Sequence, residues 1–81
     1  MKDLQKQYEQ AFGAHLKSLL KKYNKNVITV AAHANIESKQ IYRVINAEHS
    51  TSLSIIFRIA KGLEIHPKEL FDFDLDESMI E

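Results

Sequence analysis

A short segment near the middle of the chain carries side chains that can donate hydrogen bonds at helical spacing. Lys39 and Arg43 are four residues apart, so they lie one turn apart on the same face of a helix. The other side of that helix is apolar, with Ile41, Val44 and Ile45. A helix held by its apolar side could present Lys and Arg outward to acceptors such as guanine O6 and N7. The alternative is a solvated polar face, which any surface helix has.

The rest of the chain offers little material for catalysis or metal binding. It has no cysteine, which excludes disulfides, thiolate zinc sites and cysteine nucleophiles. None of its four histidines lies three or four residues from another, the spacing that helical zinc sites use: His15, His33, His49 and His66. A Gly-rich phosphate loop and a nucleophile turn for seryl catalysis are also missing. We therefore expect no enzyme, no metal, no cofactor and no small-molecule ligand.

Charge is distributed unevenly along the 81 residues, which suffice for one small domain. Eleven basic and eleven acidic residues give a formal net charge of zero, and a zero balance argues weakly against nucleic acid. The last ten residues contain five acidic residues and no Lys or Arg, so the remainder carries a net charge of +5. We divide the chain into a basic body, residues 1–71, and an acidic tail, residues 72–81. Because the body alone is basic, the zero net charge of the whole chain does not exclude binding to DNA.

Apolar periodicity and a low content of Gly and Pro favour an all-α domain. Helices are predicted over residues 4–23, 27–34, 38–46 and 53–63, with a short fifth helix beginning at Pro67. The second helix is the least obvious, because its first four residues are β-branched and favour a strand locally. Its apolar residues nevertheless recur at positions i, i+3, i+4 and i+7, so we predict a helix.

Polar residues stand where these helices should begin or end. The predicted N-caps are Asp3, Asn26, Thr51 or Ser52, and His66. Asn35 follows the second helix and can adopt the left-handed conformation of a C-cap. Pro67 suits the first position of a helix, because the N–H that it lacks would have no partner there.

The spacing within residues 27–46 is typical of a helix-turn-helix. Ala31 is small at the point where the two helices would cross, and Asn35 supplies the left-handed residue of the turn. The positions that would hold the second helix in place are apolar: Val30, Ala34, Ile36, Ile41 and Val44.

On these residues the chain resembles the Cro/phage-repressor (Xre) class of helix-turn-helix regulators, over residues 12–71. Three segments are similar to the family's first-helix signature, its Leu-Ala pair and its recognition-helix packing face: Phe12-Gly13-x-His15-Leu16-Lys17-x-Leu19, Val30-Ala31 and Ile41-x-x-Val44. A fourth segment is similar to the family's fourth helix: Ser52-Leu53-Ser54-x-Ile56-x-x-Ile59-Ala60-Lys61-x-Leu63, followed by Ile65.

The resemblance implies a compact five-helix domain of the lambda-repressor type, with residues 38–46 as the recognition helix. It also implies a transcriptional regulator that binds operator DNA as a homodimer. Ser38, Lys39 and Arg43 would then read bases, whereas Glu37 could accept from cytosine N4 or only cap the helix. Contacts to the DNA backbone are expected from the neighbouring turns: Lys25, Asn26, Tyr42, Asn46, His49, Ser50, Thr51 and Ser52. Capping is an equally good role for Thr51 and Ser52.

Two departures from the family pattern affect this interpretation. Val27 and Ile28 stand where the family often has a Gln that touches a phosphate, and neither side chain can donate a hydrogen bond. Leu20 and Ile45 stand where the family commonly joins an Arg to a Glu. Because both members of that pair are apolar here, no buried charge is left alone, and we predict contact between Leu20 and Ile45.

Apolar residues beyond the core are candidates for a dimer surface. The candidates in the C-terminal part are Leu63, Ile65, Leu70, Phe71, Phe73 and Leu75, and Leu4 and Tyr8 either cover the core or add to that surface. From residue 71 to residue 76, apolar and acidic residues alternate, which suggests an extended segment whose apolar face docks on its own domain or on a partner in the dimer. The alternative for residues 77–81 is a frayed, solvated end.

A rival hypothesis keeps the fold and changes the function. A protein-interaction module, such as an antitoxin-like or regulatory partner with little DNA binding, would also suit the zero net charge, Val27 and the acidic tail. Salt-dependent binding to random duplex separates the two hypotheses. The sequence contains neither the apolar segment of a signal peptide nor an apolar run long enough to cross a bilayer, so we expect a cytoplasmic protein.

Overall fold

The computed structural model describes residues 4–48 and 51–74. Its helices are α1 (Leu4–Lys22), α2 (Val27–Ala34), α3 (Ser38–Ile45), α4 (Leu53–Leu63) and the 3₁₀-helix η1 (Pro67–Phe71). The described residues include no strand, which confirms the all-α class. The expected short fifth helix is the 3₁₀-helix η1, so the described residues form four α-helices and not five. Its bonds from Glu69 N to His66 O and from Asp72 N to Glu69 O join residues three apart, as short 3₁₀ segments do.

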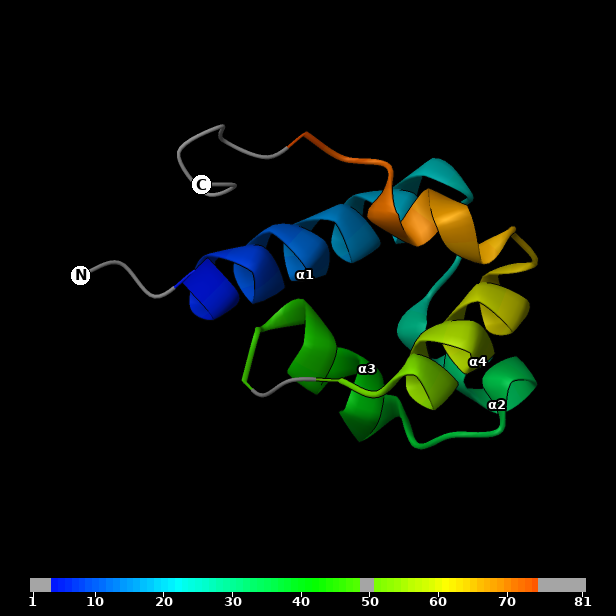
Figure 1. The fold of residues 1–81 in the computed structure, drawn as a ribbon. Coiled ribbons are helices and arrows are strands. Elements are labelled where there is room, and N and C mark those ends of the chain that lie inside the picture. The colour runs from blue at the N-terminus through cyan, green and yellow to red at the C-terminus, as the bar shows by residue number, and fades with distance from the viewer. Residues whose placement is uncertain (1–3, 49–50, 75–81) are drawn as a thin grey trace.

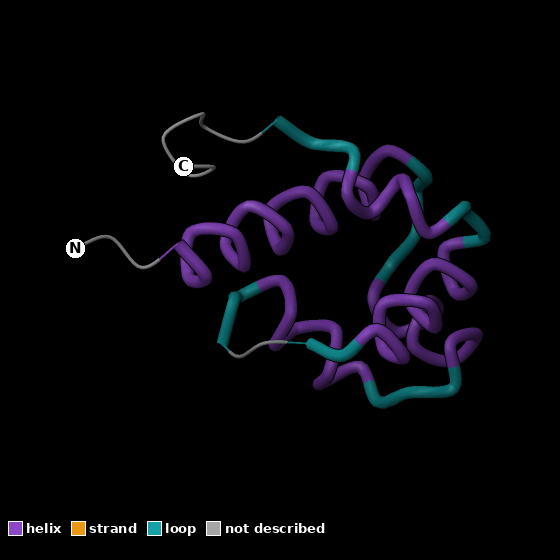
Figure 2. The backbone as a smooth tube through the Cα atoms, viewed as in Figure 1, coloured by secondary structure: helices purple, strands orange, loops and turns teal. Residues whose placement is uncertain are grey.

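The helices pack around one core (Figures 1 and 2). α1 runs along one side of the molecule, and α2, α3 and α4 gather on the other side. η1 folds back against the C-terminal half of α1 and also contacts α4. The side chains that are almost completely inaccessible to solvent come from every one of these elements: Leu16, Val30, Ile41, Ile59, Leu63 and Leu70. None of the described helices is long and apolar enough to cross a membrane.

The helix ends follow the predicted capping residues closely. Asn26 Oδ1 accepts from Thr29 N at 2.8 Å, and Ser52 Oγ accepts from Ile55 N at 3.2 Å. The ring of His66 accepts from Lys68 N at 3.1 Å at the start of η1. These bonds satisfy donors that have no partner within the helix, which is how a β-branched segment such as α2 can begin as a helix. The predicted cap at Asp3 lies outside the described residues.

Two glycines mark the closest approaches between helices. A Cβ on Gly13 would lie 2.5 Å from the carbonyl oxygens of Val44 and Ile45, where α1 crosses the end of α3. A Cβ on Gly62 would lie 2.4 Å from Val30 O, where α4 crosses α2. Because real Cβ atoms do not approach other atoms so closely, any side chain at either position would push the helices apart.

Aromatic side chains and two polar bonds attach the C-terminal segment to α1. The rings of Phe71 and Phe73 lie 5.2 and 6.3 Å from that of Phe12, centroid to centroid. His15 Nε2 donates to Glu69 O at 2.6 Å, and the hydroxyl of Tyr23 donates to Glu69 Oε1. Residues 67–73 are therefore part of the folded body.

The structure corrects two members of the proposed dimer surface. Leu63 and Leu70 are each 1% exposed, because α4 and η1 turn them into the core, and they cannot form a surface. Ile65 and Phe73 are partly buried against the core, and Phe71 is 43% exposed. Leu75 lies outside the described residues.

Candidate nucleic-acid interface

Helix α3 has one buried side and one exposed side, as the periodicity predicted. Ile41 and Val44 are buried in the core, whereas Lys39 is exposed and Tyr42 is 49% exposed. Arg43 lies one turn from Lys39 and is partly buried. The helix therefore presents an exposed face of hydrogen-bond donors, while its apolar side holds it to the domain.

The turn before α3 holds this helix at a defined angle to α2. Asn35 adopts the left-handed conformation, with φ 58° and ψ 45°. The N–H of Asn35 donates to Ala32 O at 3.2 Å, and the N–H of Ile36 donates to Ala31 O at 3.1 Å. Arg58 Nη1 on α4 donates to Asn35 O at 3.2 Å. The turn is therefore held by backbone hydrogen bonds to α2 and by the side-chain hydrogen bond from Arg58 on α4.

The N-terminal end of α3 holds the other two base-reading candidates. Glu37 occupies the N-cap position, is exposed and makes no capping hydrogen bond with its side chain. Its carboxylate is therefore not used in capping. Ser38, the first residue of the helix, is partly buried.

The backbone-contact candidates separate into two groups in space. Asn46 directly follows α3 and lines the same groove as Tyr42, a residue of α3 itself. Lys25 and Asn26 precede α2; Asn26 caps that helix, and Lys25 Nζ lies 3.8 Å from Glu64 Oε1. These four residues form the first group.

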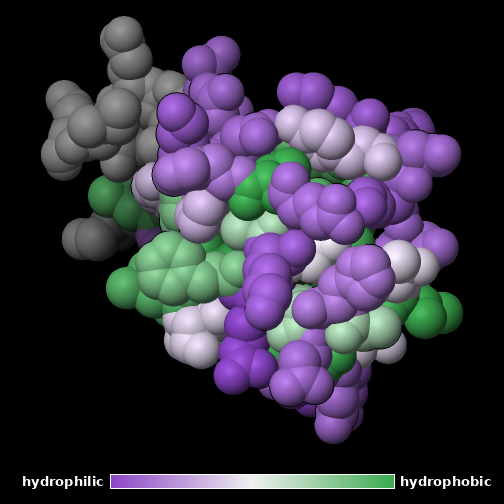
Figure 3. Space-filling view, turned by 90° about the vertical axis from the view of Figure 1, so that its right-hand side faces the viewer, coloured by the Kyte–Doolittle hydropathy of each residue, from purple (hydrophilic) through white to green (hydrophobic). Residues whose placement is uncertain are grey.

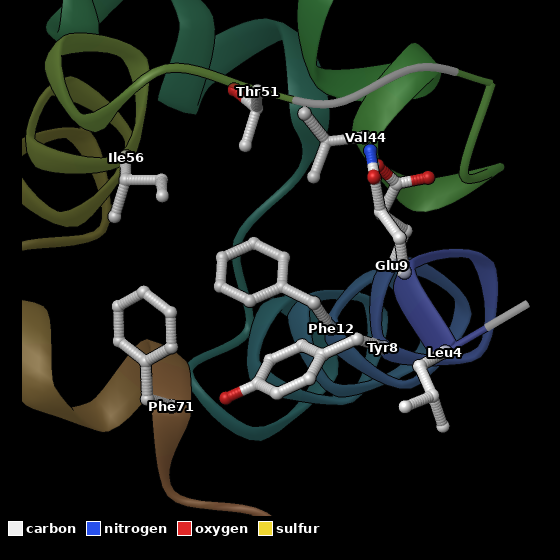
Figure 4. A pocket seen from close by; sticks show the side chains of 9 residues that line it. Leu4, Tyr8, Glu9, Phe12, Val44, Thr51, Ile56 and Phe71 are labelled. Carbon is white, nitrogen blue, oxygen red and sulfur yellow. The ribbon is translucent and has the colours of Figure 1, made fainter. Parts of the chain in front are cut away.

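The second group lies around the start of α4. Ser52 caps that helix and keeps its hydroxyl hydrogen available as a donor. Thr51 lines an apolar pocket of about 390 Å³ between α1, α3, α4 and Phe71 (Figure 4). His49 and Ser50 lie outside the described residues.

A basic groove beside α3 adds residues that the sequence reasoning missed. The missed residues are Lys17 and Lys21, which line it together with Lys25, Tyr42 and Asn46 of the expected interface. The signal in the sequence was the spacing of four residues between successive lysines, which places Lys17 and Lys21 on one face of α1. The same groove is lined by Leu20 and Ile45, so these two apolar residues lie on the same side of the molecule.

Metal chemistry has no support in the part of the chain that the structure describes. Residues 4–48 and 51–74 contain no group of three His, Cys, Asp or Glu side chains that could hold an ion.

The comparisons with known proteins agree with this geometry. The family of Cro/C1-type HTH DNA-binding domains matches residues 15–76. The structure is similar to the restriction-modification controller protein C.AhdI from Aeromonas hydrophila, with a TM-score of 0.73 and 27% sequence identity. That similarity covers 78% of this chain and 96% of the controller chain. No curated protein sequence matches this chain at a significant level. By the family match over most of its length, this chain belongs to the Cro/C1-type helix-turn-helix DNA-binding domain family.

Proposed function

We propose that this protein is a sequence-specific transcriptional regulator that binds operator DNA as a homodimer, with α3 in the major groove. The observation that carries the proposal is the exposed face of α3, which places Lys39 one turn from Arg43 while Ile41 and Val44 fix the helix from behind. Arg and Lys at such positions can donate to guanine O6 and N7. Ser38 and Glu37 complete the set of base-reading candidates at the start of the helix.

The charge distribution and the structural comparison support the same function. Residues 1–71, which include the whole helix-turn-helix, have a net charge of +5 that suits a phosphate backbone. The backbone contacts would come from Lys25, Asn26, Tyr42, Asn46, His49, Ser50, Thr51 and Ser52. The similarity to C.AhdI, a restriction-modification controller protein, supports a role as a controller.

Selection from a pool of random duplexes tests this function directly. Two-fold symmetry in the protein should recover an inverted repeat whose half-sites are about one turn of DNA, roughly 10 base pairs, apart. Recovery of a single unrepeated site would contradict the homodimer, and recovery of no preferred sequence would contradict sequence-specific binding.

The oligomeric state is measured independently by sedimentation, with and without the selected duplex. We expect a dimer, because one short recognition helix in one major groove gives only modest affinity. Of the proposed surface residues, Phe71 is exposed, and Leu4 and Tyr8, which line the same pocket, are 43% and 44% exposed. A monomer both free and on the full inverted repeat would overturn this part of the proposal.

One observation favours the alternative of a protein-interaction module. Ile28 near the start of α2 is 72% exposed, and Leu53 and Phe57, one turn apart on α4, are 68% and 56% exposed. Figure 3 shows apolar surface exposed among polar residues on the side of the molecule that lies at the right of Figure 1. Titration with random duplex at several salt concentrations separates the two functions: affinity that falls steeply with salt indicates phosphate contacts, and no binding at low salt favours the interaction module.

A further inference from the structure

A groove of about 600 Å³ runs between the C-terminal half of α1, the start of α2 and the exposed side of α3. We call it the lysine groove. Its lining residues are Ala14, Lys17, Ser18, Leu20, Lys21, Lys25, Val27, Tyr42, Ile45 and Asn46.

Positive charge dominates this groove. Three of its lining side chains are lysines and none is a carboxylate. Lys17 and Lys21 are exposed and form no ion pair with a described residue. Lys25 lines the groove but also forms an ion pair outside it, because its Nζ lies 3.8 Å from Glu64 Oε1. A groove with unpaired ammonium groups and no acid attracts an anion.

The apolar residues that line the groove add no competing charge. Leu20, Val27 and Ile45 are apolar, so no ion pair inside the groove occupies the lysines. An ion pair between α1 and α3 at the Leu20 and Ile45 positions would place a carboxylate where it repels a phosphate. The apolar replacement therefore keeps the lysine groove uniformly basic.

One wall of the groove belongs to the expected recognition helix. Tyr42 of α3 and Asn46, which directly follows that helix, line the groove, and the exposed side of α3 also carries Lys39. When that side enters a major groove, a phosphodiester strand at its border passes along the same wall. The Tyr42 hydroxyl and the Asn46 amide can donate to phosphate oxygens, while the lysines face the strand from α1.

We propose that the lysine groove holds one phosphodiester strand of duplex DNA, with Lys17 and Lys21 on α1 as phosphate-contacting residues. This proposal rests on the proposed function. The lysine groove supplies positive charge beside the start of α2, where the Val27 side chain cannot donate a hydrogen bond to a phosphate. The contacts are independent of sequence, so they position the protein on the duplex and do not select bases.

The test compares two double variants that remove the same charge. Lys17→Gln with Lys21→Gln neutralises the α1 lysines of the groove, and Lys61→Gln with Lys68→Gln neutralises two exposed lysines outside it. Binding of each full-length protein to a selected duplex and to a random duplex is measured over a series of salt concentrations. We expect the groove variant to flatten the slope of log K against log salt by about 2, because each neutralised phosphate contributes roughly 0.9 to that slope. Its preference among sequences should stay the same.

The control variant and the wild type distinguish failure of the groove proposal from failure of the proposed function. If the control variant flattens the slope as much as the groove variant, or the groove variant leaves it unchanged, the lysine groove is not a phosphate site. Absence of salt-dependent binding in the wild type would instead contradict the proposed function itself.

Amide chemical shifts of the wild-type protein give a second measurement that needs no variant. Duplex should shift the Lys17 and Lys21 amides, and unmoved signals there beside moved signals in α3 would overturn the proposal.

Discussion

Lys39 and Arg43 are candidates for base reading because of the helix that carries them as well as their donor groups. Both are cationic donors, as are nine other residues of the chain. They lie one turn apart on a helix that Ile41 and Val44 fix from the other side, with Lys39 exposed and Arg43 partly buried. A donor can read a base only when its backbone is held still, because the discrimination depends on bidentate geometry.

Replacing either donor should relax recognition at one base pair. For Lys39→Ala or Arg43→Ala we expect a loss of about 1–3 kcal/mol at the selected site and weaker preference at a single position. Repeating the duplex selection with each variant measures this directly. Lys61→Ala, on the exposed side of α4, serves as the control and should keep the full preference. Unchanged preference in both α3 variants would contradict their assignment as base readers.

Tyr23 and Glu69, which are 46 residues apart in the chain, form a second feature at the scale of residues. The hydrogen bond that the Tyr23 hydroxyl donates to Glu69, with burial and the nearby carboxylate charge, raises the pKa of Tyr23 above its ordinary value of 10.0. The bond needs the protonated phenol. Its contribution to stability is therefore complete below about pH 10 and is lost as pH rises through the raised pKa.

This linkage predicts a difference between two tyrosine variants in alkali. Denaturant unfolding of the wild type should show stability falling above about pH 10, and Tyr23→Phe should show a smaller fall from a lower starting stability. Tyr42→Phe removes a phenol that forms no hydrogen bond to a described residue and should follow the wild-type curve. Parallel curves for the wild type and Tyr23→Phe would show that the bond does not contribute.

At the scale of elements, the position of α3 depends on close packing between helices. Gly13 lets α1 approach the last turn of α3, and Gly62 lets α4 approach α2. Asn35 then sets the direction of the chain between α2 and α3. The helix-turn-helix is therefore held in part by helices outside its own residues.

Gly62→Ala tests this packing. Alanine favours a helix over glycine by about 1 kcal/mol, so an isolated α4 would gain stability. In the folded protein the new Cβ would lie 2.4 Å from Val30 O, a backbone atom that cannot turn away. We expect a net loss of about 1–3 kcal/mol in the free energy of unfolding, as for other overpacked cores. Ser54→Ala, on the exposed side of the same helix, should change stability little, and a stabilised Gly62→Ala would contradict the close approach.

At the scale of the whole molecule, positive and negative charge are separated along the chain, and the fold brings three lysines, Lys17, Lys21 and Lys25, to one groove. The body carries the excess of Lys and Arg, and residues 72–81 carry five acidic side chains. Phe73 nevertheless packs beside Phe12 and His15, so the acidic segment begins within the folded body. A simple deletion from residue 72 would remove this packing together with the charge.

Replacing the carboxylates by amides isolates the effect of charge. The variant Asp72→Asn, Asp74→Asn, Asp76→Asn, Glu77→Gln and Glu81→Gln keeps Phe73 and removes five negative charges. We expect tighter binding to random duplex at low salt, with the gain disappearing as salt screens the charges. Thermal unfolding checks that the variant is folded. Equal affinity of the folded variant and the wild type at low salt would show that the tail is too remote to matter.

The sequence predicted the helical elements well because their causes are local. Asn26 and Ser52 each bond to a backbone N–H three residues ahead, so capping is visible within one turn of the chain. The predicted count of five helices was slightly off, because the short fifth segment, Pro67–Phe71, is a 3₁₀-helix beside four α-helices in the described residues. The base-reading residues remain predictions that duplex selection can decide.

By itself, the sequence determined that this chain is an all-α domain with a helix-turn-helix, because periodicity and capping act over a few residues. Only the tertiary structure decided which side chains are buried and which residues from different helices lie next to each other. It buried Leu63 and Leu70, which sequence reasoning had placed on a surface, and it brought Lys17 and Lys21 to one groove with Tyr42. The reason is physical: burial and the grouping of charges depend on how helices cross, and the crossings depend on packing between residues far apart in the chain.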